Sequence, residues 1–131
     1  MLKNVFFGAA LIWTIVIAIL CLVSFNNIPK LGFSNSDKYA HFTFYFVFSG
    51  LWFFYFSHRK DNLNKVSTFI MVFFLSLVYG IVIEILQHLF TDTRKADIFD
   101  VLANAFGALV GLLSIGFYQK YLQRINFRIN I

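Results

Sequence analysis

Charged residues are scarce in this sequence. Asp, Glu, Lys and Arg together make up 13% of the 131 residues, whereas soluble domains carry about 25%. Hydrophobic residues make up 60%, and the mean hydropathy is +0.75. A water-soluble globular domain is therefore excluded, and the composition is that of an integral membrane protein.

Cysteine and several chemical motifs are also missing or rare. The single cysteine, Cys21, excludes an internal disulfide and a cysteine-based metal site. The net charge is +5, but the basic residues are scattered and form no stripe that would fit nucleic acid. The sequence contains no Ser/His/Asp or Cys/His arrangement of a nucleophilic enzyme and no glycine-rich phosphate loop. Nucleic acid is thus excluded as a partner, and no enzyme class is indicated.

Long apolar runs are what the chain has instead. Four runs of about the length that crosses a bilayer as a helix cover residues 5–24, 39–57, 66–90 and 98–118. The first run is longer than the apolar core of a secretory signal and lacks a following small-residue cleavage site, so we expect a retained helix. Short connections predict an all-α antiparallel four-transmembrane-helix bundle, a single domain over residues 1–131. The tail after residue 118 alternates basic and apolar residues and is expected to lie along the membrane surface.

Lysine and arginine are divided unequally between the two ends of this bundle. Seven lie on the side of the termini, namely Lys3, Arg59, Lys60, Lys65, Lys120, Arg124 and Arg128. Four lie on the other side, namely Lys30, Lys38, Arg94 and Lys95. Because positively charged loops stay in the cytoplasm, both termini are expected to be cytoplasmic.

Polar residues occur in three of the runs at matching depths, judged from a rise of about 1.5 Å per residue. From the outer boundary inward the layers are Asp37, Lys38 and Asp97; then His41, Gln87 and Asp100; then Tyr45, Glu84 and Asn104. Within each run the spacing is that of one helix face. We therefore expect a shared polar recess that opens to the outer leaflet.

Two further expectations follow from this arrangement. Ionisable groups inside a membrane are costly, so Glu84 should hydrogen-bond or pair with one of four residues: Tyr45, Arg94, Asp100 or Asn104. Gly80 and the Gly107-x-x-x-Gly111 pair would let neighbouring helices approach closely.

The polar residues also form an ordered series of motifs. The chain reads D-K-x-x-H from Asp37 to His41, E-x-x-Q from Glu84 to Gln87, then Arg94 and Asp97, and D-x-x-x-N-x-x-G from Asp100 to Gly107. Over residues 37–111 this series resembles the VanZ-like membrane protein family, whereas the first run carries none of the motif. The resemblance implies a small multi-pass protein of the bacterial cytoplasmic (inner) membrane. The namesake of the family is associated with resistance to the glycopeptide antibiotic teicoplanin.

Several polar residues have more than one interpretation. Glu84 is either a structural member of an ion-pair network or a carboxylate that binds and transfers a proton. Asp97 has the position of a helix N-cap, whereas Asp100 lies deeper than a cap requires. The His and acidic side chains could ligate a metal, but Glu84-x-x-x-His88 is not the zinc signature, and Lys38 and Arg94 nearby would oppose a cation. We therefore expect an ion-pair network, with no metal and no other cofactor.

Three functional hypotheses remain. The first is a binding module whose recess holds the headgroup of a lipid, a lipid-linked cell-envelope precursor or a lipoglycopeptide, with Lys38, His41 and Arg94 on its anionic group. The second is an enzyme acting on a lipid headgroup, with His41 or Glu84 as general base and Arg94 stabilising negative charge. The third is a structural partner subunit that packs through Gly107 and Gly111. The sequence leaves the oligomeric state open.

Overall fold

Helices make up nearly all of the chain that the structure describes. The computed structural model describes residues 1–23, 36–59, 64–91 and 97–129. These contain four helices and no strand: α1 (Leu2–Leu22), α2 (Ser36–Ser57), α3 (Lys65–Phe90) and α4 (Ile98–Ile129). The predicted all-helical class is confirmed, and the bounds of α1, α2 and α3 and the start of α4 lie close to the predicted runs. Arg94 and the first and third loops lie outside the described residues.

Side-chain caps explain where two of the helices begin. The Asn64 side chain accepts a hydrogen bond of 2.7 Å from the backbone N–H of Ser67 at the start of α3. At the start of α4, Asp97 Oδ1 accepts a hydrogen bond of 2.9 Å from the backbone N–H of Phe99. Each cap satisfies a backbone donor that has no partner within its own helix.

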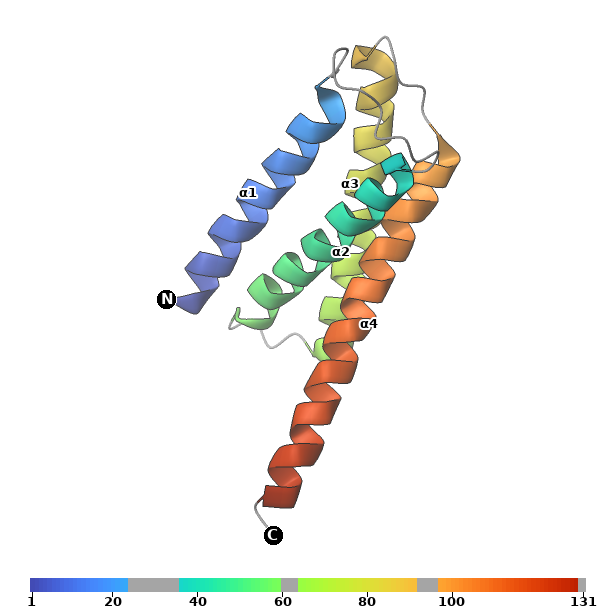
Figure 1. Ribbon diagram of the computed structural model, residues 1–131. Coiled ribbons are helices and arrows are strands. Elements are labelled where there is room, and N and C mark those ends of the chain that lie inside the picture. The colour runs from blue at the N-terminus through green and yellow to red at the C-terminus, as the bar shows by residue number, and fades with distance from the viewer. Residues whose placement is uncertain (24–35, 60–63, 92–96, 130–131) are drawn as a thin grey trace.

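Helix α4 is longer than the sequence predicted. It runs without interruption to Ile129, and Figure 1 shows it projecting beyond the other helices toward the C-terminus. The expectation of a separate surface-lying tail is therefore wrong. The tail carries no proline, and its Lys, Gln, Arg and Leu residues favour helix, so nothing in the sequence ends α4 near residue 118.

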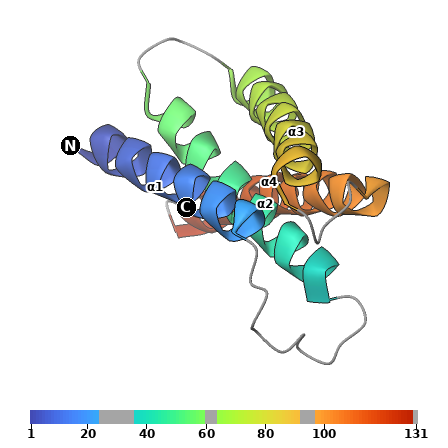
Figure 2. The ribbon, with the colours of Figure 1, turned by 90° about the horizontal axis from the view of Figure 1, so that it is seen from above.

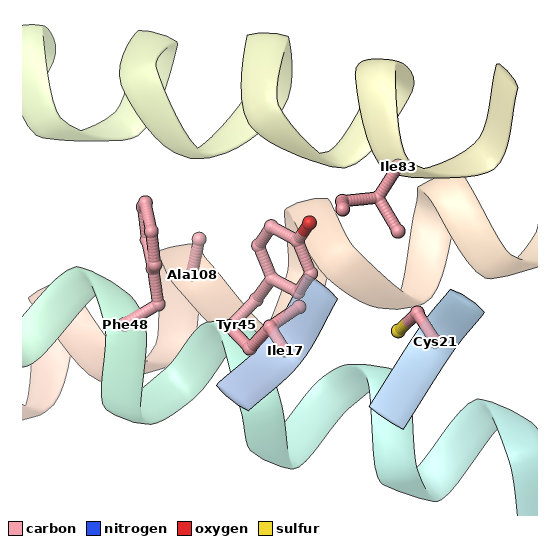
Figure 3. Packing of buried hydrophobic residues seen from close by; sticks show 6 residues of the cluster. All are labelled: Ile17, Cys21, Tyr45, Phe48, Ile83 and Ala108. Atoms are coloured by element: carbon pink, nitrogen blue, oxygen red, sulfur yellow. The ribbon is translucent and has the colours of Figure 1, made fainter. Parts of the chain in front are cut away.

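Helix α2 lies at the centre of the bundle and contacts all three other helices, α4 most extensively. In Figure 1 it lies between α1 and α4, and in Figure 2 the first turns of α2 lie on the opposite side of α4 from α3. Figure 3 shows the resulting core, to which every helix contributes: Ile17, Cys21, Tyr45, Phe48, Ile83 and Ala108. The covered position of α2 explains how it tolerates more polar residues than its neighbours.

The outer surfaces of α1, α3 and α4 are strongly apolar. Within the described residues, these three helices are long and apolar enough to cross a membrane. Large side chains such as Ile12, Phe74 and Phe106 are about two-thirds exposed. A soluble monomer rarely leaves apolar patches of that extent in water, so these faces belong in lipid.

Helix α1 joins the bundle through hydrogen bonds to backbone carbonyl groups. Tyr79 Oη of α3 donates to the carbonyl oxygen of Thr14 over 2.6 Å, and Gln87 Nε2 donates to that of Cys21 over 2.8 Å. In the other direction, Trp13 Nε1 of α1 donates to the carbonyl oxygen of Phe44 over 2.9 Å. Cys21 belongs to the last turn of α1, where carbonyl groups lack intrahelical partners, so Gln87 satisfies one of them.

Candidate functional site

A cluster of polar side chains lies where the N-terminal ends of α2 and α4 meet the C-terminal half of α3. We call it the polar cluster; its described members are Asp37, Lys38, His41, Tyr45, Glu84, Asp97, Asp100 and Asn104. His41, Tyr45, Glu84, Asp100 and Asn104 are buried, with exposed fractions of 6% or less. The two termini lie at the opposite end of the bundle in Figure 1.

His41 joins three helices at the centre of the cluster. Its Nδ1 lies 3.0 Å from Asn104 Oδ1 of α4 and 3.8 Å from Glu84 Oε1 of α3. An amide oxygen can only accept, so the contact with Asn104 is a hydrogen bond when His41 Nδ1 carries the proton. In the neutral ring, the free lone pair is then on Nε2. In the charged ring, His41 forms an ion pair with Glu84.

Lys38 lies at the more exposed edge of the cluster. Its Nζ hydrogen-bonds Asp97 Oδ2 at 3.3 Å, stands 3.9 Å from Asp100 Oδ1 and lies 5.9 Å from the centre of the Phe99 ring. The hydrogen bond from the Phe99 backbone N–H lowers the pKa of Asp97, and Lys38 lowers it further. Asp97 is therefore an ionised cap that holds Lys38 at the start of α4.

Several buried atoms of the cluster have no hydrogen-bond partner within the described part of the chain. They are both carboxylate oxygens of Glu84, Oδ1 of Asp100, the Tyr45 hydroxyl and Nδ2 of Asn104. An unsatisfied buried polar group costs about 1–3 kcal/mol, and a charged one costs more. Three of these atoms are carboxylate oxygens, so what the described cluster lacks is chiefly donors or positive charge.

The charges of the described cluster also indicate that it has few positive groups. Four carboxylates (Asp37, Glu84, Asp97 and Asp100) stand beside one lysine ammonium. Lys38 hydrogen-bonds Asp97 and also lies 3.9 Å from Asp100, so one lysine is shared between two carboxylates. One ligand atom each from Asp37, His41 and Asp100 lie within 4.8 Å of one another, and these are the described residues that could hold a metal.

Three of the four predicted partners of Glu84 do not hydrogen-bond it. Its oxygens form no hydrogen bond with Tyr45, Asp100 or Asn104, and within the described residues its Oε1 lies 3.8 Å from His41 Nδ1. His41 lies between the helices and takes the Asn104 side chain itself, which leaves Glu84 beside the imidazole. Arg94, the fourth predicted partner, lies outside the described residues.

The outermost predicted turn of α3 does not join the cluster. Gln87 is buried but hydrogen-bonds α1, and His88 is exposed. Asp37 as well as Lys38 lies close to His41. The four-residue spacing of Asp37 and His41, which places both on one face of α2, was the signal that could have linked them.

Glycines allow the helices that carry the cluster to pack closely. A Cβ on Gly107 would overlap the carbonyl oxygen of Phe42, and one on Gly111 would lie 2.6 Å from Ser49 Oγ. Both glycines therefore face α2 of the same chain. A Cβ on Gly80 would lie 3.1 Å from Asn104 Nδ2, so this glycine makes room for the amide that holds His41.

The fold and the cluster together define a small all-helical membrane protein with an acid-rich polar site buried between helices at one end of the bundle. The family model VanZ/LLP1 matches residues 4–119, so the chain belongs to this family and the resemblance seen in the motifs is confirmed. The match also covers α1, which carries none of the motif residues. No curated protein and no solved structure matches the chain.

Proposed function

We propose that the polar cluster binds the polar headgroup of a lipid or of a lipid-linked cell-envelope precursor at the outer leaflet of the bacterial cytoplasmic membrane. Glu84 and Asp100 would accept hydrogen bonds from hydroxyl, amide or amine groups of the headgroup. Lys38 and Arg94 would contact its phosphate or carboxylate, because cationic side chains make strong charge-assisted hydrogen bonds to such groups.

The observation that carries this proposal is the set of buried oxygens without donors. A binding site has unsatisfied groups before its ligand arrives, whereas a purely structural network satisfies its members. Both carboxylate oxygens of Glu84 and Oδ1 of Asp100 lack hydrogen-bond donors within the described residues. The glycine packing of α4 against α2 lies next to this site and supports a rigid wall on its inner side.

The proposal includes a four-span topology with both termini in the cytoplasm. Helix α2 has 22 residues and is thus about 33 Å long at 1.5 Å per residue, which exceeds the roughly 30 Å of the hydrocarbon core. Two of its polar residues, His41 and Ser49, are buried against its neighbours, so α2 can cross the bilayer despite its lower hydropathy. In a Cys21→Ala background, single cysteines at Asn35 and Thr93 should react with an impermeant thiol reagent in intact cells, and one at Asn62 should not. Labelling at Asn62 alone would place the cluster at the cytoplasmic leaflet.

Headgroup binding is tested by identifying the lipids that remain on the purified protein, using native mass spectrometry from nanodiscs of defined composition. We expect Arg94→Ala to lose a lipid that the wild type retains, Glu84→Gln to weaken its retention, and the lipid-facing control Ser114→Ala to retain it. A wild type that retains no lipid in preference to the bulk would refute the proposal. In a deletion strain, we expect Arg94→Lys to impair lipoglycopeptide susceptibility phenotypes more than Lys95→Ala, because lysine cannot bind an anion bidentately.

A second candidate, acid–base catalysis on a lipid headgroup, is favoured by the approach of His41 to Glu84. It differs in one outcome, since Glu84→Gln would abolish turnover while lipid retention survives. The structural-subunit hypothesis loses its basis in Gly107 and Gly111. Both glycines are covered by α2 of the same chain and are not available to a partner.

A further inference from the structure

The polar cluster contains a convergent set of metal-ligand atoms. Asp37 and His41 lie one turn apart on α2, Asp100 lies in the first turn of α4, and their ligand atoms are within 4.8 Å of one another. A point equidistant from three atoms at that largest separation lies about 2.8 Å from each. Metal bonds to carboxylate oxygen and imidazole nitrogen are about 2.0–2.2 Å long. Small side-chain rotations would therefore bring all three atoms onto one ion.

The buried carboxylates beside this group provide a second, independent observation. Glu84 is 3% exposed, has two oxygens without hydrogen-bond partners in the described residues, and lies 3.8 Å from the His41 ring. Asp100 is 6% exposed, and its Oδ1 also lacks a partner there. Lys38 stands 3.9 Å from Asp100 Oδ1 and His41 stands 3.8 Å from Glu84 Oε1, yet neither oxygen accepts a hydrogen bond within the described residues. A divalent cation bound by Asp100 would supply a direct bond to that carboxylate and a positive charge beside Glu84.

With Nε2 as the ligand atom of His41, its hydrogen bond to Asn104 through Nδ1 would orient the imidazole for a metal. Metal-bound histidines usually donate the N–H of their other nitrogen to a fixed acceptor, which sets the tautomer. Asn104 Oδ1 is such an acceptor at 3.0 Å from His41 Nδ1, and Gly80 leaves room for the Asn104 amide. The neutral ring then has its lone pair on Nε2.

Lys38 and Arg94 were the reasons for expecting no cation here. Arg94 lies outside the described residues, and the observed position of Lys38 weakens its part of the argument. Its ammonium is nearer to Asp97, at 3.3 Å, than to Asp100, at 3.9 Å. The Lys38 side chain is 39% exposed, so its flexible stem can keep the ammonium on Asp97. Asp97 thus neutralises Lys38 outside the ligand group.

We propose that Asp37, His41 and Asp100 form a binding site for one first-row divalent cation, with Glu84 as a neighbouring counter-charge. One imidazole and two carboxylates suit borderline ions such as Zn²⁺ or Mn²⁺, whereas Mg²⁺ and Ca²⁺ favour oxygen ligands alone. The site does not depend on headgroup binding, although a cation held there would add an attraction for phosphate.

The test is a titration of tag-free, chelator-treated protein in nanodiscs with Zn²⁺ alone, followed by isothermal calorimetry. Wild type should bind one Zn²⁺ per chain, and Asp37→Asn and Asp100→Asn should weaken binding at least tenfold. His88→Ala is the control, because it removes an exposed side chain that could bind Zn²⁺ but lies outside the polar cluster; its affinity should stay within twofold of wild type. Thermal unfolding without metal verifies that each variant is folded.

Two results would overturn the site: no saturable Zn²⁺ binding by the wild type, or equal weakening in all three variants. Zn²⁺ binding without selective lipid retention would uphold the metal site and refute headgroup binding. Selective lipid retention without Zn²⁺ binding would uphold headgroup binding and refute the metal site.

Discussion

The contact between α2 and α4 at Gly107 is the one where a single methyl group should do most damage. In Gly107→Ala the added Cβ would overlap the Phe42 carbonyl oxygen and lie 2.9 Å from the Phe42 carbonyl carbon, where ordinary contacts begin at 3.4 Å. The obstructing atoms are backbone, so they cannot rotate away. The helices would have to separate by at least about 0.5 Å across a close-packed interface.

The expected magnitude follows from two opposing effects. Overpacking a well-packed interface costs about 1–3 kcal/mol, and a clash with backbone belongs at the upper end. Replacing glycine by alanine inside a helix raises the free energy of unfolding by about 1 kcal/mol. We therefore expect Gly107→Ala to lower the free energy of unfolding by about 2 kcal/mol. Because Phe42 follows His41, the same displacement should lengthen the contact between His41 and Asn104.

The matched control lies on the same helix. A Cβ on Gly116 would meet nothing within 4 Å, so Gly116→Ala should be neutral or stabilising by up to about 1 kcal/mol. The measurement is reversible denaturation of both variants in mixed micelles, followed by far-ultraviolet circular dichroism. If Gly107→Ala is as stable as Gly116→Ala, the described close packing of α4 on α2 is wrong.

Two further predictions concern the ends of the helices. Gln87→Leu should lower the free energy of unfolding by about 1–3 kcal/mol in the same denaturation experiment, because it removes the donor of the hydrogen bond to the Cys21 carbonyl group. The exposed control His88→Leu should cost almost nothing. Equal costs would refute the role of Gln87 in holding α1. The pKa of Asp97 is lowered in the folded protein by the backbone N–H that it caps and by Lys38. The contribution of Asp97 to stability is therefore fully present above the ordinary aspartate pKa of about 3.9. It is lost as the pH falls through the lower pKa of the folded state. Asp97→Asn should lack that part of the acid-induced loss of thermal stability, and an unchanged pH profile would contradict the assignment.

Local sequence was sufficient for the class of protein, the helices and the depth of the polar residues. The lengths of the apolar runs predicted α1, α2 and α3 closely, because a membrane-spanning helix needs a minimum apolar length that can be counted, but they did not predict the end of α4. Depth along a helix follows from a fixed rise per residue, so residues as distant as His41 and Asn104 could be assigned to neighbouring layers. The order of the motifs was enough to indicate the VanZ-like family.

Tertiary structure alone decided which side chains meet. The rotation of each helix about its axis depends on how all its neighbours pack, so local spacing could not show that His41, rather than Asn104, would approach Glu84. For the same reason, it could not show that Gln87 would hydrogen-bond α1. Local spacing also could not show that Gly107 packs against α2 of the same chain. A glycine pair indicates only that another backbone comes close, and the packing of the whole bundle decides which backbone that is.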